Sequence, residues 1–206
     1  MARITSPICR KCRREGTKLF LKGERCSSAK CSFIRRSYAP GFKGASGYSR
    51  LTEYGVQLRE KQKAKAIYGI LEKQFRGYYD LIGKGKKENT MLGLIERRLD
   101  NVVFRLGFAS SRRAARQAIS HSRFLVNGKK NNIPSYQVKV GDVITFKNKD
   151  EKDISKEIKN NLKRNNPVSW LKTNPDSLVG EVTSMPKSED IGEEVNERLI
   201  IEFYSR

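Results

Sequence analysis

The chain has 206 residues, of which 43 are Lys or Arg and 22 are Asp or Glu, giving a formal net charge of +21. A surface this basic repels itself and favours a polyanionic partner such as nucleic acid. No stretch approaches the roughly 18 consecutive apolar residues of a membrane span, and the first residues hold no apolar signal region, so we expect a cytoplasmic protein rather than a membrane or secreted one.

The charge is distributed unevenly along the chain. Residues 1–50 contain thirteen Lys and Arg against two Glu, whereas residues 176–202 contain eight Asp and Glu against two Lys and Arg. The basic part is therefore expected to face the polyanion. The acidic segment is expected to face solvent or a basic protein neighbour.

Four cysteines within the first 31 residues form the first motif. They are Cys9, Cys12, Cys26 and Cys31, spaced as C-x2-C, thirteen residues, and C-x4-C. Two close pairs joined by a short loop suit a tetrahedral zinc ion, and neighbouring Lys and Arg favour the thiolate form. The motif predicts one Zn²⁺ per chain. An Fe–S cluster and unligated thiols are the alternatives, whereas disulfides would suit a secreted protein.

Residues 38–50 are rich in Gly and Ser and have no hydrophobic period, which predicts an extended basic arm carrying Lys43 and Arg50. Residues 51–79 then present apolar side chains at the spacing of a helix. These are Tyr54, Leu58, Ile67, Leu71, Phe75 and Tyr78. We expect Gly69 to divide this region into two helices.

Residues 90–108 predict a further helix. Its core face would be formed by Leu92, Ile95, Leu99, Val102, Val103 and Leu106. Asn89 or Thr90 is the expected N-cap, and Gly107 is the expected stop.

The stretch from Ser110 to Lys130 carries the second motif. Ser110 or Ser111 is suited to cap a helix whose interior begins at Arg112. At about 100° per residue, one face collects basic and polar residues, and another collects small apolar residues that would pack on the preceding helix. The first set is Arg112, Arg113, Arg116, Ser120 and Arg123, and the second is Ala114, Ala115, Ala118 and Ile119.

This arginine face has few acidic residues near it. Between Arg97 and Lys130 the only carboxylate is that of Asp100, whereas a solvated, salt-bridged helix would alternate its charges. Guanidinium groups and the free N–H groups of a helix N-terminus both suit phosphates. The pattern therefore favours a nucleic-acid surface over a merely solvated face.

A hairpin follows the arginine helix. Residues 124–127 predict the beginning of a strand, Asn127 and Gly128 form the strongest short turn signal, and residues 140–146 predict another strand. Lys129 and Lys130 extend the basic surface. Farther on, we expect a charged helix over residues 148–166 and a final strand over residues 197–205.

Two helices followed by a hairpin describe a small RNA-binding module. The sequence RLDNVVFRLGFASSRRAARQAISHSRFLVNGKKNNIPSYQVKVGDVI resembles the alpha-L RNA-binding module, most closely the version in the family of the fourth small-subunit ribosomal protein of bacteria. LTEYGVQLREKQKAKAIYGILEKQF and the C-terminal NERLIIEFYSR resemble the same family, as does the cysteine arrangement, which some members use for zinc. The resemblance covers nearly the whole chain.

The resemblance implies an α+β fold with a four-cysteine zinc-binding segment and basic arm (1–47), a helical domain (48–90) and an alpha-L domain with an antiparallel sheet (91–206, core module about 97–157). It implies a structural, non-enzymatic protein that binds small-subunit ribosomal RNA in the 5′ domain and nucleates subunit assembly. It also implies contact with the fifth small-subunit protein, at an interface that influences accuracy, and with messenger RNA where it enters the subunit.

The RNA-binding residues follow from the motifs and the resemblance together. In the module they are Arg97, Arg98, Arg105, Ser111, Arg112, Arg113, Arg116, His121, Arg123, Lys129 and Lys130, and in the arm they are Lys43 and Arg50, beside the messenger path. No catalytic residue is expected.

Two other functions fit parts of the sequence. An RNA-modifying enzyme such as a pseudouridine synthase can carry an alpha-L module, but it needs a separate catalytic domain for which 206 residues leave little room. A free translational regulator that binds messenger RNA makes the same demands on the sequence as a ribosomal protein. Only its location in the cell separates these two.

Overall fold

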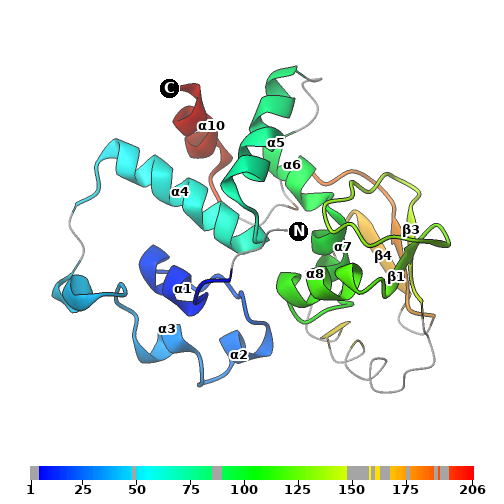
Figure 1. Cartoon of the computed structure of the whole chain (residues 1–206), viewed down its shortest axis with the longest axis horizontal. Coiled ribbons are helices and arrows are strands. Elements are labelled where there is room, and N and C mark those ends of the chain that lie inside the picture. The colour runs from blue at the N-terminus through cyan, green and yellow to red at the C-terminus, as the bar shows by residue number, and fades with distance from the viewer. Residues whose placement is uncertain are drawn as a thin grey trace. The chain divides into compact units, whose positions relative to one another are not determined.

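The computed structural model describes residues 5–47, 50–84, 90–147, 158, 161–162, 168–174, 177–187, 190 and 195–206. The chain divides into two units. We call Met1–Lys87 with Glu193–Arg206 the helical unit, and Glu88–Gly192 the sheet unit. Figure 1 shows the helices of the first and the strands of the second.

Helices account for the described secondary structure of the helical unit. They are α1 (Cys9–Glu15), α2 (Glu24–Ser27), α3 (Ser32–Arg35), the 3₁₀ turn η1 (Phe42–Ser46), α4 (Glu53–Tyr68), α5 (Glu72–Lys84) and α10 (Glu197–Ser205). The predicted break at Gly69 is confirmed, because this residue ends α4 with a left-handed φ of 64°, a conformation that costs glycine little. The arm expected to be extended contains η1 instead.

The expected strand over residues 197–205 was wrong, because this segment is the helix α10. Asn196 caps it by accepting a hydrogen bond from the backbone N–H of Arg198. Ile200 is buried, and Phe203 and Tyr204 follow it at three- and four-residue steps, so the apolar residues share one helical face. In a strand, alternate side chains share a face, and the predicted strand would have placed Ile201 in a core. In the helix Ile201 is exposed.

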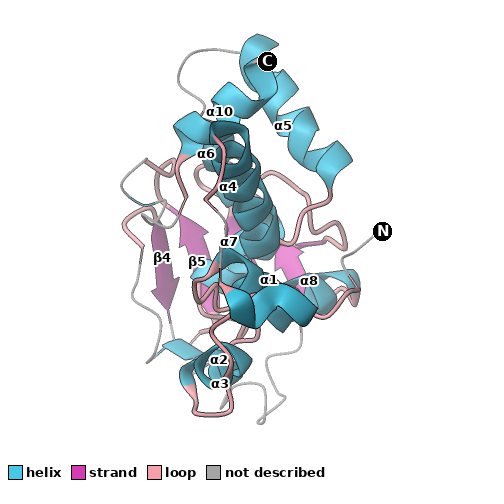
Figure 2. Cartoon of the chain, turned by 90° about the vertical axis from the view of Figure 1, so that its left-hand side faces the viewer, coloured by secondary structure: helices cyan, strands magenta, loops and turns pink. Residues whose placement is uncertain are grey.

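Aromatic rings and charges hold α10 on α4 and α5, which Figure 2 shows beside it. The Lys61 Nζ lies 4.0 Å from the centre of the Phe203 ring and 3.0 Å from Glu72 Oε1. Glu72 also contacts Lys65 Nζ at 2.6 Å and accepts a hydrogen bond from the Tyr204 hydroxyl at 2.6 Å. Burial disfavours the charged form of Glu72, but these hydrogen bonds outweigh it and lower its pKa to about 2. Burial and the nearby Glu72 raise the pKa of Tyr204.

The sheet unit packs helices against one antiparallel sheet. Its elements are α6 (Met91–Glu96), α7 (Leu99–Arg105), α8 (Arg112–Ser120), β1 (Phe124–Val126), β2 (Lys129–Lys130), β3 (Val143–Phe146), β4 (Leu171–Asn174) and β5 (Val179–Val182). The strands lie in the order β2-β1-β3-β5-β4, with every neighbouring pair antiparallel. The predicted α+β class is therefore confirmed.

The single helix predicted over residues 90–108 is two helices. Of the two predicted caps, Asn89 and Thr90, the structure has Thr90, whose hydroxyl accepts the N–H of Gly93. The helix ends at Glu96, and the next begins at Leu99. Between them Arg98 is extended (φ −66°, ψ 137°) and pairs with Gln137 as an antiparallel bridge. The hydrogen bond that a continuous helix would form is replaced by one to a distant segment, from Leu99 N to the Tyr136 carbonyl at 2.9 Å.

The core of the sheet unit lies between α7, α8 and the sheet. All six residues of the predicted core face in residues 90–108 are buried, with exposed fractions of 0–2%. Phe124 of β1 stacks on Phe108 and meets Phe146 of β3 edge to face, with ring centres 4.6 Å apart in the second pair. Ala115 and Ile119 of α8 are fully buried against this cluster, as the small-residue arc predicts.

The predicted charged helix over residues 148–166 lies almost entirely outside the described residues. Of this stretch, Ile158 and Asn161 are described and buried. In the described part of the chain, no helix is long and apolar enough to cross a membrane.

Candidate nucleic-acid interface

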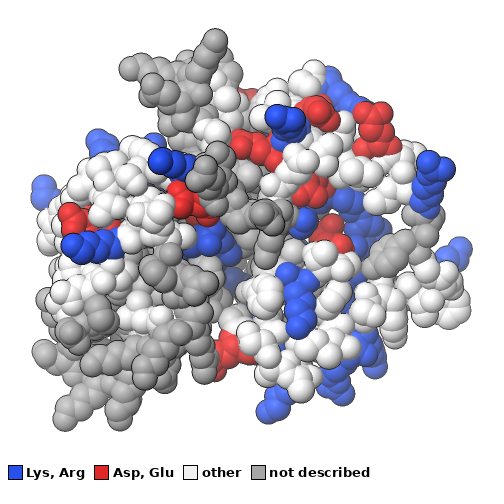
Figure 3. All heavy atoms as spheres, turned by 180° about the vertical axis from the view of Figure 1, so that it is seen from behind, with Lys and Arg blue, Asp and Glu red and all other residues white. Residues whose placement is uncertain are grey.

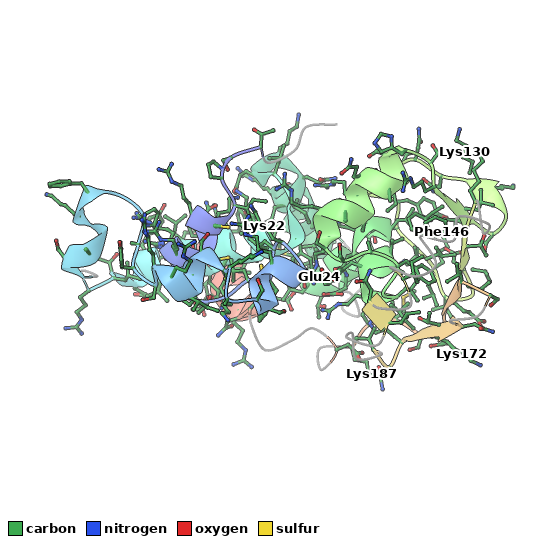
Figure 4. All side chains as sticks on the ribbon, turned by 90° about the horizontal axis from the view of Figure 1, so that it is seen from below. Lys22, Glu24, Lys130, Phe146, Lys172 and Lys187 are labelled. Atoms are coloured by element: carbon green, nitrogen blue, oxygen red, sulfur yellow. The ribbon has the colours of Figure 1, made fainter. Side chains whose placement is uncertain are left out.

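Helix α8 and the hairpin after it present exposed basic side chains. Of the two predicted caps, Ser110 and Ser111, the structure has Ser111. Its hydroxyl accepts the N–H of Ala114, and α8 begins at Arg112. The exposed members of the predicted set in this unit are Arg113, His121, Arg123, Lys129 and Lys130, which we call the basic rim. Figure 4 shows the Lys130 side chain pointing away from the unit, while Phe146 lies within it.

The hairpin that carries part of the basic rim is fixed by its turn residues. Asn127 and Gly128 have φ values of 50° and 75°, so both central positions adopt the left-handed conformation that a tight hairpin turn needs. The Asn127 amide donates to Asp142 Oδ1 at 2.8 Å, and its oxygen accepts the N–H of Val143 at 2.8 Å. Asp142 is buried and also accepts the N–H of Lys139. Lys129 and Lys130 therefore project from a rigid turn.

Arg98 is part of a buried ion network instead of the surface. Its Nε donates to Asp100 Oδ1 at 3.0 Å and its Nη2 to Asp100 Oδ2 at 2.8 Å. The guanidinium of Arg116, from α8, lies 3.2 Å from the same Oδ2. Arg98 is 0% exposed, so it is removed from the predicted RNA-binding set: it connects the α6–α7 junction to α8. Ser111 is also buried, and its hydroxyl serves as the helix cap.

A second network joins two more of the predicted arginines. Arg105 donates from Nε and Nη2 to the carboxylate of Glu96, at 3.2 and 2.9 Å. The Asn101 amide donates to the same carboxylate at 2.5 Å, and Arg112 donates to Asn101 Oδ1 at 2.7 Å. The Arg112 guanidinium also lies 4.6 Å from the centre of the Phe104 ring. Arg105 and Arg112 remain partly exposed, with fixed orientations at the border of the basic rim.

We expected few acidic residues near the arginine face, but two of them bind arginines of this set. Asp100 and the buried Glu96, which precedes the 97–130 stretch by one residue, each bind arginines from this set. Arg97 is half-buried and donates to the Val138 carbonyl at 3.1 Å. The residues that the structure leaves most open to a polyanion are therefore those of the basic rim.

In the helical unit, the two predicted arm residues are exposed. Lys43 lies in η1, and Arg50 lies a few residues before α4. The acidic segment is described only in part: Glu197 begins α10 and is half-buried, whereas Glu193 and Glu194 lie outside the described residues.

The four cysteines form no disulfide, and Cys12, Cys26 and Cys31 are buried. Burial raises the pKa of the Cys12 thiol, and the charges of Cys26, Cys9 and Cys31 raise it as well. The backbone N–H of Leu19, which donates to the Cys12 sulfur, acts in the opposite direction and lowers this pKa. The backbone N–H of Lys22 donates to Cys26 Sγ at 3.3 Å. Figure 4 labels Lys22 and Glu24 in this segment. Within the residues that the structure describes, no three His, Cys, Asp or Glu side chains converge closely enough to form a metal site.

The first helices carry a basic cluster that the sequence prediction missed. Figure 3 shows Lys and Arg side chains gathered over the part of its face that holds α1 to α3. Arg13, Ser32, Arg35 and Arg36 line a surface pocket there. The signal available in the sequence was the Arg35-Arg36 pair just after the last cysteine, which the prediction counted only as general charge.

Comparison with known proteins matches both units. Residues 3–97 match the family described as "Ribosomal protein S4/S9 N-terminal domain", and residues 97–144 match the "S4 domain". The chain is 53% identical over 209 residues to small ribosomal subunit protein uS4 of Heliobacterium modesticaldum, and 52% identical over 210 residues to that of Citrifermentans bemidjiense. The protein of the same name from Desulfitobacterium hafniense is 51% identical over 209 residues, and in all three cases the similarity covers 100% of both chains. The chain therefore belongs to the ribosomal protein S4 family.

Proposed function

We propose that the chain is a structural constituent of the small ribosomal subunit that binds ribosomal RNA through the sheet unit. The observation that carries this proposal is the exposed basic rim of the sheet unit. In addition, the sequence matches small-subunit ribosomal proteins over its whole length. Membership in a ribosomal protein family also agrees with the prediction that the chain is not an enzyme.

The basic rim is suited to binding the sugar–phosphate backbone of RNA. A-form RNA has a major groove too narrow for side chains, so proteins recognise such helices by shape and by phosphate and 2′-OH contacts. Arg113 and Arg123 offer guanidinium forks, and Lys129 and Lys130 offer point charges from a rigid turn. Arg105, Arg112 and Arg116 contribute at its border in orientations set by Glu96, Asn101 and Asp100.

The specific partners belong to the same proposal. The RNA is the 5′ domain of small-subunit rRNA, where early binding would nucleate assembly. Lys43 and Arg50, both exposed, would contact messenger RNA where it enters the subunit. The acidic segment near Glu197 would face the fifth small-subunit protein and influence translational accuracy, because a basic neighbour attracts carboxylates that phosphates repel.

The proposal includes one zinc ion held by Cys9, Cys12, Cys26 and Cys31. What supports it is the spacing of two close pairs in the sequence and the N–H groups directed at the sulfurs of Cys12 and Cys26. Such N–H groups orient and stabilise thiolate ligands. Zinc held by these four thiolates would act as a structural ion that joins α1 to the segment of α2 and α3.

Binding to an isolated rRNA fragment tests the RNA proposal. The full chain and a 5′-domain transcript would be equilibrated with increasing KCl, with a transcript from another domain of the same rRNA as the control. We expect tighter binding to the 5′ domain and a log–log salt slope that reflects several phosphate contacts. Equal affinity for the two transcripts would contradict the assignment of the 5′ domain.

A further inference from the structure

The hairpin turn of the sheet unit contains a chemically labile pair of residues. Asn127 is followed by Gly128, and no other Asn of the sequence is followed by Gly. The turn needs this pair for its conformation, because both residues have positive φ values, 50° and 75°. A Cβ added at Gly128 would meet no atom within 4 Å, so backbone conformation rather than lack of space selects glycine there.

An Asn-Gly sequence can react with itself. The backbone nitrogen of the glycine attacks the side-chain carbon Cγ of the asparagine, so that an N–Cγ bond forms and the Cγ–Nδ2 bond breaks. The attacking nitrogen loses its proton, and the departing nitrogen gains one and leaves as ammonia. Water then opens the succinimide ring at either carbonyl, which leaves aspartate or isoaspartate. Glycine favours the attack because it has no side chain to hinder the approach of its nitrogen.

In the folded chain Asn127 is held at three atoms. Its backbone N–H donates to the Val143 carbonyl at 2.9 Å, and its Oδ1 accepts the N–H of Val143 at 2.8 Å. Its Nδ2 donates to Asp142 Oδ1 at 2.8 Å. Ring closure brings Cγ to bonding distance of the Gly128 nitrogen, and this displaces both side-chain atoms that the hydrogen bonds hold. The reaction in the folded chain therefore has to break both bonds.

Asp142 is suited to restrain this amide group. It is buried, and its second oxygen, Oδ2, accepts the N–H of Lys139 at 2.8 Å, so the carboxylate itself is fixed in place. A carboxylate accepts hydrogen bonds and has no proton to donate, so it does not help the Asn127 nitrogen to depart as ammonia. The pairing of β1 with both β2 and β3 also restrains the backbone at the turn.

We propose that Asn127-Gly128 is a deamidation site, and that Asp142 and Val143 keep its reaction slow as long as the sheet unit stays folded. Loss of these bonds frees the side chain and lets the reaction proceed at the rate that the dipeptide sets by itself.

The product would change the turn in two ways. It would replace a neutral amide by a carboxylate, next to Asp142 and directly before the two lysines of the basic rim. Isoaspartate would also add a methylene group to the backbone between Val126 and Lys129, which pair with each other across the hairpin. Both changes disfavour the turn, so the bonds to Asn127 preserve the hairpin chemically as well as in conformation.

Peptide mapping by mass spectrometry measures this reaction directly. The full chain would be kept folded in buffer or unfolded in guanidinium chloride, and the fractions of Asn, Asp and isoaspartate at position 127 would be followed over several days. We expect the reaction to be slower in the folded chain by about tenfold or more, since two hydrogen bonds must break first. Equal rates in the two states would overturn the proposal.

Substitutions at Asp142 test the source of the restraint. Asp142→Asn keeps the shape of the side chain but leaves one acceptor oxygen for two donors, and Asp142→Ala leaves none. We expect Asn127 to react faster in both folded variants than in the folded wild type, with Asp142→Ala the faster of the two. Circular dichroism would check the fold, and Asp142→Asn decides if Asp142→Ala does not fold. A wild-type rate in folded Asp142→Asn would refute the role of Asp142.

The matched control is Asp190→Asn, in the same unit. Asp190 accepts the N–H of Lys187, three residues before it, as Asp142 accepts that of Lys139, but its other oxygen bonds to Ser169. This variant loses the same charge and should deaminate Asn127 no faster than the wild type. A rate raised as much as in Asp142→Asn would show that the loss of a charge, and not the hydrogen bond to the turn, governs the reaction.

Discussion

Arg98 and Asp100 form a bidentate ion pair inside the sheet unit, with N–O distances of 3.0 and 2.8 Å. The Arg98 side chain is 0% exposed and that of Asp100 is 5% exposed. Arg116 lies 3.2 Å from the same carboxylate, so one buried acid orients two arginines from different parts of the chain. The pair thus connects the break between α6 and α7 to the helix that carries part of the basic rim.

Removing Arg98 should destabilise the sheet unit strongly. Arg98→Ala leaves a buried carboxylate short of one partner, and breaking such a pair costs about 3–5 kcal/mol. Urea unfolding followed by circular dichroism would measure the change. Arg113→Ala is the control: this arginine is exposed, so its free energy of unfolding should change by less than about 0.5 kcal/mol. Equal effects of the two variants would contradict the structural role of Arg98.

Removing charge from the basic rim should weaken RNA binding without unfolding the unit. In Arg113→Ala/Arg123→Ala, the log–log salt slope for 5′-domain rRNA should fall by about 0.7–0.9 per arginine. Lys172 and Lys187 are exposed residues that Figure 4 shows at the side of the unit opposite Lys130. Lys172→Ala/Lys187→Ala is therefore the matched control, with the same loss of two charges. A slope reduced as much in the control as in the rim variant would show that total charge, and not the rim, governs binding.

Helix α10 should be held more weakly at acid pH. The pKa of Glu72 is about 2 in the folded chain against its usual 4.5, so the carboxylate stabilises the fold above about pH 4.5 and loses that contribution as the pH falls toward 2. Because the Glu72 side chain is 45% exposed, solvent screens its pairs, each worth at most about 1 kcal/mol. Unfolding of Glu72→Gln should therefore differ from the wild type at pH 6 and approach it as the pH falls.

The control for this prediction is Glu53→Gln. Glu53 is 83% exposed and lies 3.6 Å from Arg206, so its loss should leave the pH dependence of unfolding close to that of the wild type. A difference between Glu72→Gln and wild type that stays constant from pH 6 to pH 3 would contradict the assigned role of Glu72.

The zinc proposal predicts about one zinc per chain in protein purified without oxygen or chelator. Chelation should loosen residues 1–40 first, measured as faster amide hydrogen exchange there, while the sheet unit keeps its protection on its own core. Replacing Cys12 and Cys26 with Ser should abolish zinc retention. Protein without zinc, with four titratable thiols and unchanged exchange in the presence of chelator, would refute the proposal.

Local signals predicted those elements whose ends are set by neighbouring residues. Gly69, Ser111 and the Asn127-Gly128 turn all act where the sequence places them, because caps and left-handed turns depend on one or two side chains. The break at Arg98 was missed, because its backbone pairs with a segment about 40 residues away that no local pattern contains.

The sequence predicted which residues gather at the candidate site better than it predicted which of them are exposed. The apolar and arginine arcs of α8 follow from helical periodicity, and the structure confirms the buried arc. Which arginines face inward depends on Glu96, Asp100 and Asn101, whose side chains reach them only once α6, α7 and α8 have folded together. Helical periodicity predicts on which face of its own helix a residue lies. It does not predict whether an acidic side chain of another helix will bind that residue.

The central claim, that this chain is an rRNA-bound constituent of the small ribosomal subunit, is tested most directly by sucrose-gradient fractionation of cells that carry it with a small epitope tag. The account predicts that the chain sediments with small subunits and remains there after a wash in moderate salt, with little in the soluble fractions. It also predicts that Arg113→Ala/Arg123→Ala moves part of the chain to the top of the gradient at lower salt than Lys172→Ala/Lys187→Ala does. Wild-type chain found mainly at the top of the gradient, free of small subunits at low salt, would contradict the account.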